Sequence, residues 1–383
     1  MTGADGFVCD VVVVGAGIAG LCAAGELVRA GRRVLIIEKS RGVGGRMATR
    51  RVGAAVCDHG AQFFTVRQPE FGGIVAAAQE AGAVVEWCAG FLREGSISGE
   101  SGSTREIAAA PDGHPRWRGV RGMTDLPKRL AESLTDAAAG GRCRILTNTK
   151  VTAIGAAGGG VRIAVERDSG VETITAGGAV LTSPVPQTLD LLAAGGLLDG
   201  DHPDSIQSAG GSVVAPETRR LLESVDYDPC FALVLVLDRP SRVPPPGGIQ
   251  FAAEARGPIA WLADNQQKGT SPVPALTVHA TGAFSRAHFE RPQEEVADLL
   301  IDAVRPWIDG DPAIAVVDRS LHRWKFALPT TVIPAPLVAA LTTPPIVCCG
   351  DAFAGPRVEG AATSGLATGR WMHGVLQQCT AAP

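Results

Sequence analysis

The sequence predicts an α/β protein built on a parallel sheet, and three observations near its beginning carry that prediction. Residues 11–14 are four consecutive valines, a run too apolar for a strand that faces solvent. The pattern G-x-G-x-x-G follows at once over residues 15–20, and a second apolar run at residues 33–37 ends at Glu38. A strand, a glycine-rich turn, a helical pattern and another strand in this order are typical of a βαβ unit.

The glycine-rich turn has the layout of a dinucleotide site. Gly15 allows a tight exit from the strand, Gly17 lets the backbone approach a pyrophosphate, and Gly20 permits close packing of the helix. Phosphates bind the free N–H groups at the start of such a helix, and an acid after the second strand accepts ribose hydroxyls. The predicted cofactor contacts here are Gly15, Ala16, Gly17, Ile18, Ala19, Gly20 and Glu38.

Length and composition bound the remaining alternatives. The 383 residues predict two domains, and a formal net charge of −4 argues against a general nucleic-acid surface. The apolar run near the N-terminus is interrupted by glycines and preceded by Asp5 and Asp10, so we expect neither a signal peptide nor a membrane span. Nine cysteines without C-x-x-C spacing or paired histidines favour reduced thiols, a cytoplasmic location and no metal site.

The order of strand-like runs predicts a discontinuous cofactor domain. Three runs from residue 150 onward, separated by glycine-containing turns, predict a β-meander, and an apolar run at residues 346–349 returns the chain to the parallel sheet. We expect this domain to comprise residues 1–65, 142–204 and 343–383. Residues 66–141 and 205–342 would form a smaller α+β substrate domain with a largely antiparallel sheet, covered by a helix at residues 292–308.

The segment after Glu38 changes the expected cofactor from NAD to FAD. Residues 39–47, K-S-R-G-V-G-G-R-M, resemble the second flavin signature of amine oxidase and glutathione reductase-like flavoproteins, whose paired glycines and arginine pass under the FAD pyrophosphate. The resemblance adds Lys39, Gly45, Arg46 and Met47 to the cofactor contacts. The Arg46 guanidinium would neutralise phosphate charge.

A third segment resembles renalase-type flavoproteins. Residues 58–64 read D-H-G-A-Q-F-F, similar to the D-x-G-A-Q segment that passes beside the isoalloxazine, which implies contacts from Gly60, Ala61, Gln62 and Phe63. His59 occupies the variable position of this pattern, and we interpret it as structural. In related flavoproteins the residue at Val151 holds the adenine through its backbone.

The C-terminal part supplies the last flavin elements. Gly350 and Asp351 end an apolar strand, where Asp351 would accept a ribityl hydroxyl or lie beside the pyrophosphate. The start of the last helix, with Glu359, Gly360, Ala361 and Ala362, would face the flavin pyrimidine with its positive dipole end. Some amine oxidases tether the flavin through a C-terminal cysteine, but we interpret Cys348 and Cys349 as buried strand and expect non-covalent FAD.

Taken together, the chain resembles bacterial members of the renalase family of FAD-dependent oxidoreductases. Family-like strings recur in order along nearly the whole chain, among them S-P-V-P-Q, A-W-L-A-D-N, H-R-W-K and R-V-E-G-A. The resemblance implies oxidation of isomeric dihydro-NAD(P) to NAD(P)+, with electrons passed through the flavin to oxygen to give hydrogen peroxide. Hydride loss from such a ring restores aromaticity, so it requires orientation and no catalytic base.

Substrate contacts are expected from the second domain. His279 and Trp324 are the candidate catalytic residues, although a mid-strand histidine and a tryptophan also fill cores. Asn265, Lys268 and Lys325 are candidates for binding a substrate amide or phosphate. Relatives more often carry arginine at Lys325 and an acidic-aromatic pair at Ala283-Phe284.

Two other functions remain open from the sequence. A flavin amine oxidase or desaturase of the same superfamily would act on an amine, yet a single tyrosine, Tyr227, supplies an aromatic cage poorly. A non-catalytic FAD-binding protein is the alternative from a different class. For an enzyme we expect a small-molecule substrate, a dihydronicotinamide or an amine, with molecular oxygen as electron acceptor, and for any of these functions neither nucleic acid nor a membrane as partner.

Overall fold

The computed structural model describes residues 7–97, 104–109, 113–136, 140–168, 170–198, 213–251 and 257–381. The chain forms two compact units. Unit 1 comprises Met1–Gly45, Pro127–Asp226 and Pro329–Pro383, and unit 2 comprises Arg46–Leu126 and Tyr227–Leu328. The chain changes unit after residues 45, 126, 226 and 328, whereas the expected boundaries follow residues 65, 141, 204 and 342. The expected boundary at 204 lies outside the described residues.

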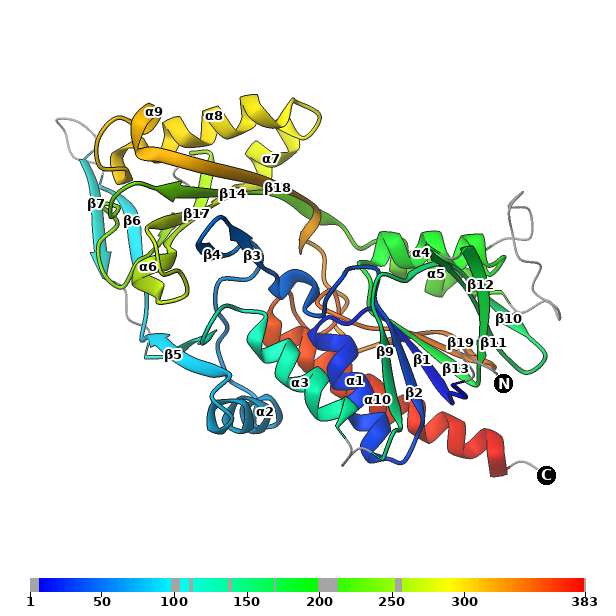
Figure 1. Ribbon diagram of the computed structural model, residues 1–383. Helices are drawn as coiled ribbons and strands as arrows, with labels where there is room; N and C mark the ends of the chain where they lie inside the picture. Colours follow the sequence, from blue (N-terminus) through cyan, green and yellow to red (C-terminus); the bar gives the residue numbers. More distant parts are fainter. Residues whose placement is uncertain are drawn as a thin grey trace. The chain divides into compact units, whose positions relative to one another are not determined.

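Unit 1 is centred on a six-stranded sheet in the order β19-β20-β13-β1-β2-β9 (Figure 1). The four valines form β1, which is buried and pairs in parallel with both β13 and β2. Only the edge strand β19 runs antiparallel to its neighbour β20. The other strands of this sheet are β2 (Val34–Ile37), β9 (Cys143–Leu146), β13 (Gly178–Leu181), β19 (Val338–Thr342) and β20 (Pro345–Cys348).

The first and last helices of the chain, α1 (Ile18–Arg29) and α10 (Val358–Ala381), lie side by side in Figure 1. A Cβ at Gly365 would stand 2.1 Å from the Ala19 carbonyl oxygen, and one at Gly369 would stand 2.6 Å from that of Ala23. Both distances are too short for any side chain, so glycine is required for this close packing.

The predicted β-meander is confirmed as the antiparallel sheet β10 (Lys150–Ala157), β11 (Gly160–Arg167) and β12 (Gly170–Ala176). Figure 1 shows it on the side of the parallel sheet opposite to α1 and α10. The remaining helices of unit 1 are α4 (Val185–Ala194) and α5 (Pro216–Glu223), and α3 (Asp125–Thr135) begins in unit 2 and continues into unit 1.

Unit 2 contains a seven-stranded sheet in the order β18-β14-β17-β16-β15-β6-β7. The pairs β14–β17, β17–β16, β16–β15 and β6–β7 are antiparallel, as expected, whereas β15 and β6 are parallel. The strands are β6 (Leu92–Ile97), β7 (Thr104–Ala109), β14 (Tyr227–Leu237), β15 (Gly248–Phe251), β16 (Ile259–Asp264), β17 (Ala275–Ala280) and β18 (Val316–Pro329). Two further antiparallel pairs accompany it: β3 (Thr49–Val52) and β4 (Ala55–Asp58) form a hairpin, and β5 (Val84–Cys88) pairs with β8 (Arg116–Gly119).

Strand β14 is buried on both faces, and this places the hairpin of β3 and β4. Phe231, Leu233 and Leu235 pack in one cluster with α8 (Gln293–Val304), the expected covering helix. Val234 and Val236 face the other way and pack against residues of β3 and β4. The hairpin is therefore anchored by apolar burial, and the loop that follows it starts from a fixed position. The other helices of unit 2 are α2 (Pro69–Glu80), α6 (Asn265–Lys268), α7 (Gly282–His288) and α9 (Pro312–Ala315).

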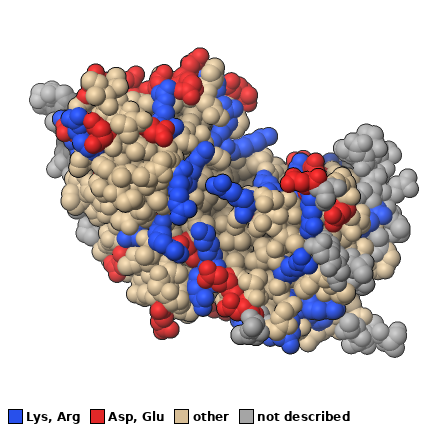
Figure 2. All heavy atoms as spheres, viewed as in Figure 1, with Lys and Arg blue, Asp and Glu red and all other residues tan. Residues whose placement is uncertain are grey.

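No described helix is both long and apolar enough to span a bilayer. Both signs of charge occur on the face shown in Figure 2, and uncharged residues occupy most of it. This agrees with the small net charge of the chain.

Candidate functional site

The glycine-rich turn after β1 has the geometry predicted for a pyrophosphate. Gly15 has φ +103°, and a Cβ there would stand 2.4 Å from Thr182 Oγ1. A Cβ at Gly20 would stand 2.1 Å from the Gly15 carbonyl oxygen, so the helix packs directly on the turn. A Cβ at Gly17 would meet nothing within 4 Å. Two glycines are therefore required by packing, while the third borders open space that a ligand can occupy.

The start of α1 is suited to an anion. Its N-cap residue Gly17 provides no side-chain cap, and its first turn contains no acidic residue. The first N–H groups of a helix have no intrahelical partner and carry the positive end of its dipole. Phosphate oxygens fit both features.

Glu38 ends up beside the turn because β1 and β2 are parallel and end together. Its carboxylate is buried, accepting a hydrogen bond from Ala16 N–H at 2.9 Å and one from Ser40 N–H at 2.8 Å. Each carboxylate oxygen has a further lone pair, so Glu38 can accept ribose hydroxyls while it holds the turn.

The paired glycines of the flavin signature lie against the same turn. Gly44 N–H donates to the Ala16 carbonyl at 2.9 Å, and a Cβ at Gly45 would stand 3.4 Å from Gly17 Cα. In unit 1 this brings the two segments together as the resemblance implies. Lys39 is exposed and Met47 is buried. In unit 2, Arg46 Nη1 donates to the carbonyls of Phe326 at 3.3 Å and Ala327 at 3.4 Å.

The C-terminal elements β20 and α10 also belong to unit 1, and they hold the turn that contains Gly350 and Asp351. Gly350 follows β20 with φ +135°, and its N–H donates to Ser364 Oγ of α10 at 2.9 Å. That bond holds the Gly350-Asp351 turn, at the carboxyl end of the sheet, against α10. A Cβ at Gly360 would stand 2.2 Å from the Gly355 carbonyl oxygen, so the start of α10 is tightly wound on its own loop.

The two adjacent cysteines, Cys348 at the end of β20 and Cys349 after it, are buried, as expected. Burial raises the pKa of Cys349 to about 12 and that of Cys348 still further. A protonated thiol is a poor nucleophile, which fits non-covalent FAD. Val151 is also buried and pairs with Val165 in the meander.

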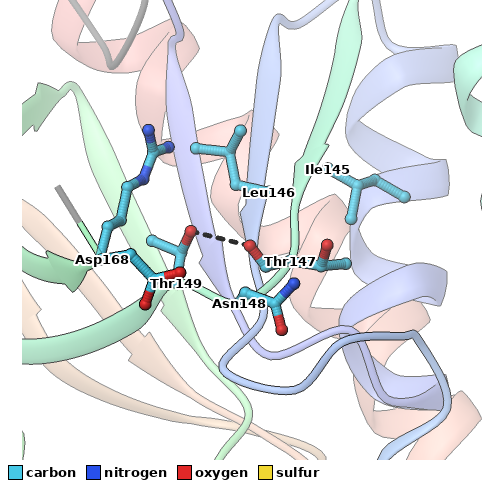
Figure 3. A pocket seen from close by; sticks show the side chains of 7 residues that line it. Ile145, Leu146, Thr147, Asn148, Thr149 and Asp168 are labelled. Atoms are coloured by element: carbon cyan, nitrogen blue, oxygen red, sulfur yellow. Dashed lines mark hydrogen bonds between the residues drawn. The ribbon is translucent and has the colours of Figure 1, made fainter.

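Sequence reasoning missed a pocket at the carboxyl end of β9. It is an open pocket of about 460 Å³, and Figure 3 shows Thr147, Asn148, Thr149 and Asp168 around it. Asn148 has φ 49°, and the N–H groups of Asn148 and Thr149 donate to the carbonyls of Ser40 and Glu38. The pocket thus borders the backbone of the segment that carries Glu38. The loop T-N-T could have been noticed as a turn, but its link to Glu38 is tertiary.

In unit 2, the candidate substrate residues Lys268 and Asn265 are both buried and make polar contacts within the protein. Lys268 and Asp58 are fully buried, and Lys268 Nζ lies 2.7 Å from Asp58 Oδ2. Asp58 Oδ1 accepts from Thr49 Oγ1 at 2.5 Å and from Met123 N–H at 2.8 Å. Asn265 is buried too, and its Nδ2 donates to Thr277 Oγ1 at 2.9 Å. Lys268 therefore has its ammonium engaged by Asp58, which corrects its expected role, whereas Asn265 Oδ1 is buried without a hydrogen-bond partner among the described residues.

The other candidates lie around the loop after β4. Gly60 packs against Arg46, whose carbonyl accepts the Ala61 N–H at 2.8 Å. Gln62 Nε2 lies 3.4 Å from His279 Nε2, on β17. Lys325 is exposed, and its ammonium lies 5.3 Å from the Phe326 ring centroid.

Trp324 and His59 form a stacked pair that the sequence did not predict. Their ring centroids lie 5.4 Å apart with an interplanar angle of 22°, and the Trp324 indole N–H donates to the His59 carbonyl at 2.8 Å. His322 contacts both rings, 5.0 Å from His59 and 4.3 Å from Trp324. We call Trp324, His59 and His322 the aromatic cluster.

The histidines of this region are neutral near pH 7. Burial lowers the pKa of His59 to about 4, with further lowering from His322 and Arg50. Burial also lowers the pKa of His279 to about 4, with a contribution from Lys268. The pKa of His322 is lowered by burial and by Arg50. The region therefore disfavours added positive charge. No group of three or more potential metal ligands occurs among the described residues.

Comparison with known proteins agrees with this geometry. Residues 13–78 match the NAD(P)-binding Rossmann-like domain, and residues 77–370 match the flavin containing amine oxidoreductase family. AofH of Mycobacterium tuberculosis, provisionally named a flavin-containing monoamine oxidase, is 33% identical over 160 residues, 37% of this chain and 33% of AofH. Putrescine oxidase of Kocuria rosea is 49% identical over 61 residues, 16% of this chain and 13% of that protein. The chain thus aligns with a third or less of the length of these relatives.

Solved structures share the fold over nearly the whole chain. Cyclohexylamine oxidase from Brevibacterium oxydans aligns with a TM-score of 0.66 and 12% identity, covering 97% of this chain and all of the other. At this identity the match concerns the fold alone.

Proposed function

Because the chain belongs to the flavin-containing amine oxidoreductase family, we propose that it is an FAD-dependent oxidase of isomeric dihydro-NAD(P). The residues of unit 1 fit FAD: Glu38 for the ribose, the open space at Gly17 and the uncapped start of α1 for the pyrophosphate. FAD, when bound, accepts a hydride and passes two electrons to oxygen, which takes up a second proton from solvent to give hydrogen peroxide.

The observation that carries the substrate proposal is the charge around the aromatic cluster. Arg50 is near enough to lower the pKa of both His59 and His322, and no carboxylate pairs with it among the described residues. The buried carboxylate of Asp58 is already paired with Lys268. A protonated amine would meet a positive field here, whereas a phosphate-bearing dinucleotide would be attracted.

The lack of a strong base near the aromatic cluster among the described residues also favours a dihydropyridine as substrate. A dihydropyridine loses only a hydride, so the protein has to hold its ring and need not remove a proton. With pKa values of about 4, His59 and His279 are weak bases. Trp324, held by its bond to the His59 carbonyl, offers a rigid ring face against which a pyridine can stack.

The relatives favour a second candidate, oxidation of an amine, because two of them are named as amine or putrescine oxidases. Anaerobic titration of the holoenzyme separates the two. Isomeric dihydro-NAD(P) should bleach the flavin absorbance rapidly, while putrescine and cyclohexylamine should not. Bleaching by the amines and not by the dihydropyridines would establish amine oxidation, and bleaching by neither class would favour a structural flavin.

Removal of the positive charge of Arg50 provides a second test of the substrate class. Arg50→Gln should weaken the apparent affinity for dihydro-NAD(P) about tenfold, since one half-buried cation near the site is lost. Its neighbour Arg51 is exposed on the next position of β3, so Arg51→Gln is the matched control and should change affinity less than twofold. Tighter binding of the true substrate to Arg50→Gln would identify a cation.

A further inference from the structure

Two buried polar atoms in the loop after β4 have no partner. They are His59 Nδ1 and Gln62 Oε1, and both residues are more than nine-tenths buried, with exposures of 8% and 5%. A buried polar group without a hydrogen bond is costly, and such groups are rare in folded proteins. Two of them within four residues of one loop indicate a ligand that satisfies both.

The identity of the Gln62 atom follows from its contacts. Nε2 donates to the Asp58 carbonyl at 2.6 Å and to the Gly60 carbonyl at 3.0 Å. A flipped amide would place its oxygen against two carbonyl oxygens, so the orientation is fixed. Gln62 therefore presents an acceptor, and its missing partner is an N–H group.

The His59 ring is fixed by the aromatic cluster. Trp324 stacks on its face and His322 meets it edge-on, and these two contacts fix the plane of the ring. A neutral imidazole carries one N–H, and placing that hydrogen on Nδ1 makes the unpartnered atom a donor. Its missing partner is then a carbonyl oxygen.

We propose that His59 Nδ1 and Gln62 Oε1 bind a primary carboxamide on the substrate ring, whose C=O accepts from His59 and whose NH2 donates to Gln62. The inference rests on the proposed function and adds to it the group that is recognised. It assigns His59, which sequence reasoning interpreted as structural, to substrate binding. The flavin pyrimidine also carries an N–H beside a C=O, so the experiment includes an arm for that source.

The test measures binding of three non-reacting ligands to the oxidised holoenzyme through the flavin absorbance. They are NAD+, its 3-acetylpyridine analogue, which keeps the C=O and lacks the NH2, and the analogue with an unsubstituted pyridine. Wild-type enzyme should bind NAD+ most tightly, the acetyl analogue about tenfold more weakly and the unsubstituted one about a hundredfold more weakly, one hydrogen bond at each step.

Substitutions at His59 test whether its ring nitrogen binds the carbonyl group of the ligand. His59→Phe keeps a ring to stack on Trp324 and removes the nitrogen, so it should weaken both carbonyl ligands about tenfold and leave the unsubstituted one unchanged. His59→Asn places an amide nitrogen near the position of Nδ1 and should restore most of the difference.

Three outcomes would overturn the proposal. Equal affinity of wild-type enzyme for the three ligands excludes carboxamide recognition. Uniform weakening by His59→Phe shows a role in packing. If His59→Phe loses FAD, or if its flavin spectrum is shifted when no ligand is present, His59 Nδ1 and Gln62 Oε1 bind the flavin and not the substrate. Failure of dihydro-NAD(P) to reduce wild-type enzyme is a separate result that refutes the proposed function itself.

Discussion

Lys268→Met should destabilise the protein strongly while leaving substrate binding unchanged. The variant removes the ammonium that lies 2.7 Å from Asp58 Oδ2 and leaves a fully buried carboxylate with only Thr49 and Met123 as hydrogen-bond donors. Removing one partner of a buried ion pair typically costs about 3–5 kcal/mol, because the remaining charge is unpaired in a medium of low polarity. Burial lowers the pKa of Lys268 despite the opposing effect of Asp58, which shows how little water reaches the pair.

Equilibrium unfolding in urea measures this loss, and two variants calibrate it. Lys325→Met removes an exposed lysine of the same unit and should change the free energy of unfolding by less than about 0.5 kcal/mol. Asp58→Asn combined with Lys268→Met removes both charges and keeps the acceptor for Thr49 and Met123, so it should recover a large part of the lost stability.

Substrate affinity distinguishes the structural role from the binding role expected from sequence. Measured where Lys268→Met is still folded, the affinity for dihydro-NAD(P) should stay within about twofold of wild type. Stability reduced by less than about 1 kcal/mol, together with a tenfold loss of affinity, would refute the reasoning and return Lys268 to the substrate site.

Further predictions concern the cofactor, pH and the aromatic cluster. Gly17→Asp should fold, because its Cβ meets open space, yet purify without yellow colour, because the carboxylate repels the pyrophosphate. Glu38→Ala should weaken FAD binding by about 1–3 kcal/mol in a fluorescence titration, the range for a charged hydrogen bond; unchanged affinity would place the ribose contact elsewhere. His59 and His279 each have a pKa of about 4 in the folded protein and about 6.5 in the unfolded chain, so the unfolded chain binds more protons as the pH falls. The free energy of unfolding should therefore fall by about 3 kcal/mol from pH 7.5 to 5.5. If denaturation experiments give the same free energy of unfolding at both pH values, the two histidines are not buried in their neutral form. Trp324→Ala should slow anaerobic flavin reduction in stopped-flow measurements without lowering FAD content, and an unchanged rate would remove it from the site.

The cofactor half was largely predictable from local sequence. The valine run, the G-x-G-x-x-G turn and Glu38 each act within one βαβ unit, so short segments specify both the structure and its ligand chemistry. The last flavin elements were identified at the other end of the chain because their strand and helix carry recognisable residues of their own.

The second unit was predictable in its strands and not in its side-chain contacts. Lys268 and Asp58 are 210 positions apart, and Trp324 and His59 are 265 apart. Nothing local distinguishes a lysine that reaches a substrate from one that neutralises a buried carboxylate, because the difference depends on which strand brings the partner. The same reason explains why His59 was interpreted as structural.

The contact of α10 with α1 has a consequence for biosynthesis. Strand β1 and helix α1 are synthesised before β20, which pairs with β13, and before α10, which covers α1. Until then the nascent sheet has an unpaired edge at β13, and the small-residue surface of α1 at Ala19 and Ala23 has no cover. Exposed edges and apolar surfaces of this kind promote aggregation during slow assembly. The parallel sheet of unit 1 can therefore be completed only after β20 and α10 have been synthesised.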